Sequence, residues 1–135
     1  MSLKIIAALS LTATVLLAGC SAGVTANVDF SSQQYAAKVH YDNPGLRSVV
    51  SIQNFKVDRG VGISRVQATL VNNSYFSKSI EYRINWVDSS GFVVNPGSQP
   101  WTPAHLHGKE HLQVQSTAPN ADAQDFNISV RKLDN

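Results

Sequence analysis

Cysteine and charge are what this chain has least of. Its 135 residues contain one cysteine, Cys20, so no disulfide can form within the chain. Charged side chains make up 15% of the residues, with 11 Lys and Arg against 9 Asp and Glu. The positive charges are scattered and form no basic stripe, which argues against a nucleic-acid partner. The fold must therefore be stabilised by a hydrophobic core.

Groups that catalyse common reactions are also scarce. After Cys20 the chain has only two glutamates, Glu81 and Glu110, and neither has an obvious acidic partner for a glycosidase-like pair. The chain has no Gly-x-Ser-x-Gly nucleophile motif. No nucleophile, base and orienting group stand out together. We therefore expect a protein without enzymatic activity and without a cofactor.

The longest run of apolar and small residues lies at the very start of the chain. It extends from Ile5 to Gly19, follows a single positive charge at Lys4, and ends at Cys20. The run has the length of a signal-peptide core, and it is shorter than the roughly 20 apolar residues that a membrane-spanning helix needs. Its last four residues, Leu-Ala-Gly-Cys, resemble the lipobox of bacterial lipoproteins.

The lipobox resemblance implies cleavage before Cys20 and attachment of lipid to its thiol. Residues 1–19 are then the signal peptide, 20–45 the acylated cysteine and a flexible tether, and 46–135 the folded domain. Ser21 replaces the aspartate that usually retains lipoproteins in the inner membrane, which favours an outer-membrane anchor facing the periplasm. The alternatives are an ordinary secretory signal or a short anchor helix.

The clearest strand in the sequence is predicted at 79–87. Ile80, Tyr82, Ile84 and Trp86 fall on one face and alternate with polar residues on the other. Such alternation is typical of a half-buried antiparallel strand.

The rest of the domain also reads as short strands separated by turns. Further strands are predicted at 49–57, 63–72, 92–94, 110–116 and 126–133. We interpret 95–104, which contains three prolines, as an irregular connection. No segment after Cys20 shows a sustained helical period. This pattern predicts an all-β, immunoglobulin-like antiparallel β-sandwich of about five to seven strands, with a small closed barrel as the alternative.

The middle of the chain carries a family resemblance. A hydrophobic strand ending in Asn72 is followed by Tyr82-Arg83-x-x-Trp86-x-Asp88-x-x-Gly91. This pattern resembles the YcfL family of small Gram-negative envelope lipoproteins. The resemblance implies an immunoglobulin-like sandwich in the cell envelope. It supplies no catalytic residues, because the biochemical activity of that family is unknown.

Three histidines are the sharpest candidates for a metal or small-ligand site: His105, His107 and His111. Two residues separated by one position on an extended strand point the same way, as metal ligands sometimes do. Glu110 could add an oxygen ligand. The alternative is a set of surface polar residues at the entrance to a strand.

Four residues are candidates for a partner-binding surface: Tyr75, Phe76, Trp101 and Arg83. The aromatics occupy connections between strands, where exposed apolar side chains often mark contact sites. The alternatives are that the aromatics cover the core as a lid and that Arg83 pairs with a carboxylate across the sheet. We expect a sandwich held to the membrane by its N-terminal lipid and binding another envelope protein. Metal or small-ligand binding is the second hypothesis.

Overall fold

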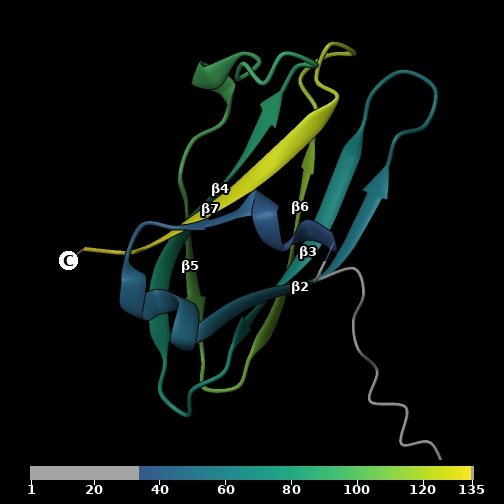
Figure 1. The fold of residues 1–135 in the computed structure, drawn as a ribbon. Coiled ribbons are helices and arrows are strands. Elements are labelled where there is room, and N and C mark those ends of the chain that lie inside the picture. Colours follow the sequence, from purple (N-terminus) through teal and green to yellow (C-terminus); the bar gives the residue numbers. More distant parts are fainter. Residues whose placement is uncertain (1–33, 135) are drawn as a thin grey trace, which may run out of the picture.

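Two β-sheets packed face to face make up the part of the chain that the structure, a computed structural model, describes (Figure 1). The described residues are 34–134. The expected signal peptide, Cys20 and the first part of the expected tether lie outside them.

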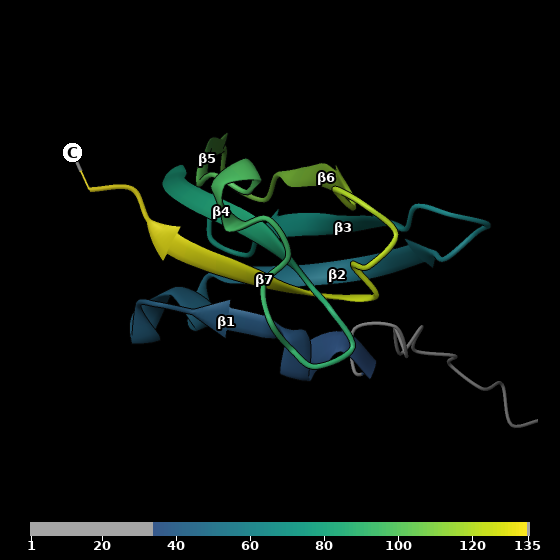
Figure 2. The same cartoon turned by 90° about the horizontal axis from the view of Figure 1, so that it is seen from above.

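One sheet has the strand order β1-β7-β4-β5, and the other has the order β2-β3-β6. The strands are β1 (Val39–Tyr41), β2 (Val50–Asp58), β3 (Arg65–Asn72), β4 (Lys78–Val87), β5 (Thr102–Leu106), β6 (His111–Thr117) and β7 (Asp125–Lys132). Short 3-10 helices also occur within residues 34–134: η1 (Ala36–Lys38), η2 (Pro44–Ser48) and η3 (Pro96–Ser98). Among the strands within residues 34–134, only β1, which runs parallel to β7, departs from antiparallel pairing. Figure 2 shows the two sheets as separate layers, so the predicted sandwich is confirmed.

The core lies between the sheets and follows the alternation predicted for β4. Ile80, Ile84 and Trp86 are buried, whereas Tyr82 is only partly covered. Trp86 sits opposite Phe126 of β7, and the two ring centroids are 5.9 Å apart. Because cross-strand aromatic pairs add to the free energy gained from burial, this pair helps to fix the register of β4 and β7.

Strand β5 is absent from the sequence-based prediction, because Pro103 lies in its middle. Proline is tolerated here since β5 is an edge strand. The Ser79 carbonyl accepts a hydrogen bond from the backbone N–H of Leu133, just after β7. Since hydrogen-bonded pairs alternate along a strand, the odd-numbered residues of β4 bond to β7 and the even-numbered residues bond to β5. Pro103 therefore falls where an N–H would point away from β4. By contrast, the predicted strand at 92–94 is reduced to one bridge, between Val87 and Val93.

The sandwich includes residues that precede the expected boundary at Leu46. Strand β1 lies inside the expected tether and pairs with β7. The Tyr35 ring packs 5.0 Å from that of Phe55 and 5.8 Å from that of Phe126. Lys38 Nζ forms an ion pair with Asp125 at 2.5 Å. Residues from Tyr35 onward thus belong to the sandwich.

The Lys38–Asp125 pair leads to a prediction about pH. Burial acts to raise the pKa of Asp125, but the hydrogen bond from Lys38, a backbone hydrogen bond from Phe126 and the charge of Arg59 together hold it below its ordinary value. A lowered pKa means that the folded state favours the carboxylate. The resulting stabilisation is present above the unfolded pKa of about 3.9 and is lost as the pH falls through the folded value.

We predict that Lys38→Met raises the pKa of Asp125, because it removes the direct hydrogen bond and the nearest positive charge. An NMR titration of the Asp125 carboxyl carbon measures this. Lys56→Met, a change at an exposed lysine of β2, serves as the control. An unchanged pKa in Lys38→Met would contradict the pairing.

Candidate interaction surface

Two loops lie side by side at one end of the sandwich, at the bottom of Figure 1. They are the β3–β4 loop, residues 73–77, and the β5–β6 loop, residues 107–110. The backbone N–H of Lys109 donates to the Ser74 carbonyl at 2.9 Å and joins them directly.

Asn72 holds these two loops together. Its side chain is fully buried at the end of β3. The Nδ2 group donates to the carbonyl oxygens of Phe76 (2.8 Å), Leu106 (3.2 Å) and His107 (2.9 Å). The Oδ1 atom accepts from the backbone N–H (3.0 Å) and the hydroxyl (2.8 Å) of Ser74. One amide therefore fixes both loops, and a buried amide that loses its partners is strongly destabilising.

Two further contacts join the β3–β4 and β5–β6 loops: a close approach of their backbones and a cation–π contact. A Cβ atom on Gly108 would overlap the Tyr75 carbonyl, so only glycine fits there. Lys109 has a positive φ of 62° and places its Nζ 4.4 Å from the centroid of the Tyr75 ring. The same Nζ donates to the Asn73 carbonyl at 2.5 Å. The loops thus form one hydrogen-bonded unit.

This unit presents two aromatic side chains to solvent. Tyr75 is 83% exposed and Phe76 is 76% exposed, so neither covers the core. Their backbone is already fixed by Asn72. A partner that contacts them would therefore lose less conformational entropy than if the loop had to be ordered on binding.

The third aromatic candidate, Trp101, lies next to two arginines on the outer face of the β1-β7-β4-β5 sheet. The guanidinium carbons of Arg83 and Arg131 lie 4.6 Å and 4.1 Å from the centroid of its ring. Arg131, not Arg83, pairs with the carboxylate of Glu81, at 2.7 Å. The alternative that Arg83 pairs with a carboxylate is therefore wrong for residues 34–134, where Arg83 stacks on Trp101 instead.

The outer face of β5 connects Trp101 to the Tyr75 loop. The His105 and His107 rings meet edge to face with centroids 5.1 Å apart, and His105 Nδ1 lies 3.0 Å from the Ser79 hydroxyl. Residues at alternate positions of a strand share a face. We use the name β5 strip for Trp101, Pro103, His105 and His107 together with Tyr75, whose loop is hydrogen-bonded to the loop that follows β5.

The predicted three-histidine metal site does not form. His111 begins β6 in the other sheet, opposite Val71. Glu110 uses Oε2 to accept the backbone N–H of His107 at 2.6 Å. Among residues 34–134, no group of three His, Cys, Asp or Glu side chains is arranged to hold a metal ion. The spacing of these histidines could not show that the chain passes from one sheet to the other between His107 and His111.

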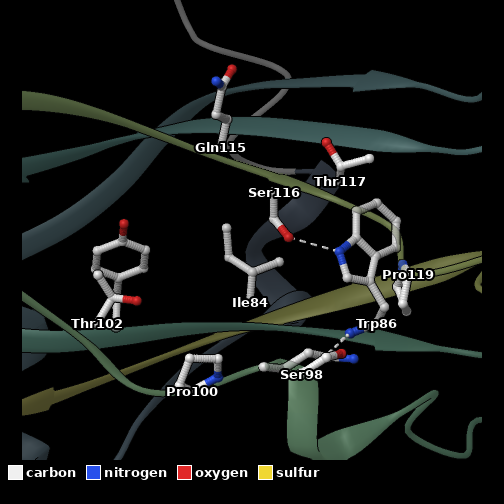
Figure 3. Close-up of a pocket in the computed structure, with 11 residues that line it drawn as sticks. Ile84, Trp86, Ser98, Pro100, Thr102, Gln115, Ser116, Thr117 and Pro119 are labelled. Carbon is white, nitrogen blue, oxygen red and sulfur yellow. Dashed lines mark hydrogen bonds between the residues drawn. The ribbon is translucent and has the colours of Figure 1, made fainter.

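Sequence reasoning also missed a pocket of about 280 Å³ between the edges of the two sheets (Figure 3). Its wall includes Trp86, whose indole N–H donates to the Ser116 hydroxyl at 2.8 Å. The Gln99 side chain accepts the backbone N–H of Trp86 at 2.6 Å. Burial raises the pKa of Tyr82, so its hydroxyl stays neutral. All eleven lining side chains are uncharged: Tyr82, Ile84, Trp86, Ser98, Gln99, Pro100, Thr102, Gln115, Ser116, Thr117 and Pro119.

Comparison with known proteins identifies the family. The family described as "Protein of unknown function (DUF1425)" matches residues 37–132. The chain belongs to the DUF1425 family. This match begins within η1, in agreement with the early start of the fold.

Two crystal structures resemble this DUF1425 protein. One is a DUF1425 family member from Shewanella sp. pv-4, determined at 1.81 Å, with 27% identity and a TM-score of 0.57 over 64% of this chain and 80% of that one. The other is Campylobacter jejuni cj0090, with 17% identity and a TM-score of 0.54 over 71% of this chain and 98% of that one. The second likeness shows the fold alone. No curated protein matches the chain.

We predict that Asn72→Ala lowers the free energy of unfolding by about 2–4 kcal/mol, because it leaves buried carbonyl and amide groups without partners. Urea denaturation measures the loss. Asn73→Ala is the matched control, since the Asn73 side chain makes one exposed hydrogen bond, to Ser51. Equal losses in the two variants would contradict the role given to Asn72.

Proposed function

We propose that this DUF1425 protein is a lipid-anchored, non-catalytic interaction module of the bacterial envelope. It binds a protein partner through the β5 strip and the adjoining Phe76. The observation that carries the proposal is the exposure of Tyr75 and Phe76 on loops that a fully buried Asn72 holds in place.

The composition of the surface supports protein binding. Tyr, Trp and Arg are the residue types that most often dominate the energy of protein interfaces. The β5 strip has Tyr75 at one end and Trp101 at the other, and Trp101 is flanked by Arg83 and Arg131. Both ends are held by local contacts, which keeps the entropic cost of binding low.

The start of the chain supports the location. The lipobox resemblance implies lipid attachment at Cys20, and the finer YcfL-family resemblance implies a place in the Gram-negative envelope. Thirteen residues, 21–33, separate Cys20 from the first described residue. A chain of this length spans at most roughly 50 Å, so the sandwich works close to the membrane. Among residues 34–134, no helix is long and apolar enough to cross a membrane.

We predict that the double variant Tyr75→Ser/Phe76→Ser captures the partner at least about tenfold less efficiently than wild type, because each exposed aromatic anchor contributes on the order of 1 kcal/mol or more. Cross-linking in intact cells, followed by purification of the tagged protein and quantitative mass spectrometry, measures capture. A melting temperature close to that of wild type shows that the variant is folded.

The matched control for this experiment is Val61→Ser/Ile63→Ser, which removes two exposed apolar side chains from the β2–β3 loop. We expect it to capture the partner as wild type does. The proposal fails if the aromatic double variant keeps full capture or if the control loses as much.

A separate prediction tests the anchor. Cells fed labelled palmitate will incorporate label into the wild-type protein and none into Cys20→Ala, because the thiol is the proposed site of acylation. Gel fluorography after purification measures incorporation. A wild-type protein without label would refute lipid attachment.

A further inference from the structure

Most edges of the two sheets carry features that hinder pairing with another chain. Strand β1 has three residues, and β5 has five with Pro103 among them. The register of β2 shifts between Gln53 and Lys56, where Asn54 has a positive φ of 53°. Short strands, prolines and bulges are the usual means by which proteins protect sheet edges.

Strand β6 is the exception. Its seven residues, His111–Thr117, pair with β3 in one continuous register from Val71↔His111 to Arg65↔Thr117. The strand contains no proline, lysine, arginine, aspartate or glutamate. It is therefore a regular, uncharged edge of the kind that accepts an added strand.

Two hydrogen bonds show which backbone groups of β6 face outward. The Asn72 N–H donates to the Glu110 carbonyl at 3.0 Å, and the Ala118 N–H donates to the Ser64 carbonyl at 2.8 Å. In an antiparallel ladder hydrogen-bonded pairs alternate, so the even-numbered residues of β6 bond to β3. The odd-numbered residues direct their N–H and C=O groups to the free edge: His111, Gln113, Gln115 and Thr117.

The uncharged pocket of Figure 3 adjoins this edge. Gln115, Ser116 and Thr117 form one wall, and Ile84 and Trp86 of β4 lie opposite. The backbone N–H of Trp86 is already taken by Gln99, so the facing edge of β4 is closed there. A strand added beside β6 would bring alternate side chains to the pocket mouth.

We propose that the free edge of β6 and this pocket bind an extended, uncharged peptide segment of a partner protein by strand addition. Backbone hydrogen bonds to Gln113 and Gln115 supply affinity, and the pocket selects an uncharged side chain. A second copy of β6 could pair along this edge through its backbone, but it would not fill the pocket, because its inward-facing Leu112 and Val114 are packed in its own core. The occupant is thus a segment that does not belong to a folded sandwich. This site is separate from the β5 strip.

The test uses the full-length protein in detergent and a phage-displayed library of random nine-residue peptides. We expect selected peptides to be uncharged, rich in β-branched residues and free of central proline. A synthetic selected peptide should bind Gln115→Pro at least about tenfold more weakly than wild type, because the variant lacks one outward N–H and disturbs its neighbours. Gln115→Ser, which shortens the side chain but keeps that N–H, should bind the peptide more tightly than Gln115→Pro does.

Two further measurements keep the proposal open to refutation if Gln115→Pro fails to fold. Thr102→Arg, which places a charge at the pocket, should weaken binding of the same peptide. Bound peptide should also slow hydrogen exchange at the amides of Gln113 and Gln115. Tyr75→Ser/Phe76→Ser should bind the peptide as wild type does, which separates this site from the proposed partner surface.

The proposal is overturned if no uncharged peptide is enriched, or if a selected peptide binds a folded Gln115→Pro or Thr102→Arg as tightly as wild type. It is also overturned if sedimentation velocity shows a wild-type dimer that Gln115→Pro dissociates, since the occupant would then be a second copy of the chain.

Discussion

The buried side chain of Asn72 is the constraint on which the surface of this protein depends. Its amide satisfies carbonyls of both the β3–β4 and β5–β6 loops, and its own backbone N–H bonds to Glu110 at the start of the β3–β6 ladder. The first set of bonds positions Tyr75 and Phe76. The backbone bond sets which groups of β6 face its free edge. A single residue thus links the exposed aromatics to the register of the neighbouring sheet.

The residues that stabilise the fold are different from those on the surfaces proposed for binding. The apolar interior, built around Trp86 and Phe126, holds the sheets together without a disulfide in the described domain. The surfaces proposed for binding are the outer face of β5, the loops at its end and the free edge of β6. These surfaces rest on strands and hydrogen-bonded turns, so a partner meets groups that are already ordered.

The sequence was sufficient for the fold where local patterns and tertiary structure agree. The alternation in 79–87 predicts β4 and its buried face because burial on one side of a strand repeats every second residue. The sequence was insufficient for strands that are defined by pairing with a distant part of the chain. Three-residue β1 is defined by β7, far along the chain, and β5 is a strand in spite of Pro103 because it lies at an edge.

For the candidate surface, too, the sequence predicted some features and could not predict others. Tyr75 and Phe76 could be singled out as aromatics in a connection, yet only the structure shows that they are exposed and do not cover the core. His111 shares the spacing of a metal ligand but belongs to the other sheet. The contact of Trp101 with Arg83 and Arg131, the role of Asn72 and the pocket beside β6 all join segments distant in sequence, so no local pattern announces them.

The central claim is that the Asn72-held loops present aromatics to a protein partner. Photo-cross-linking in intact cells tests it most directly, with a photoreactive phenylalanine analogue placed at Phe76 or, for comparison, at exposed Val61. The account predicts a discrete cross-linked species from position 76 and none from position 61. No species from position 76, or the same species from both positions, would contradict it.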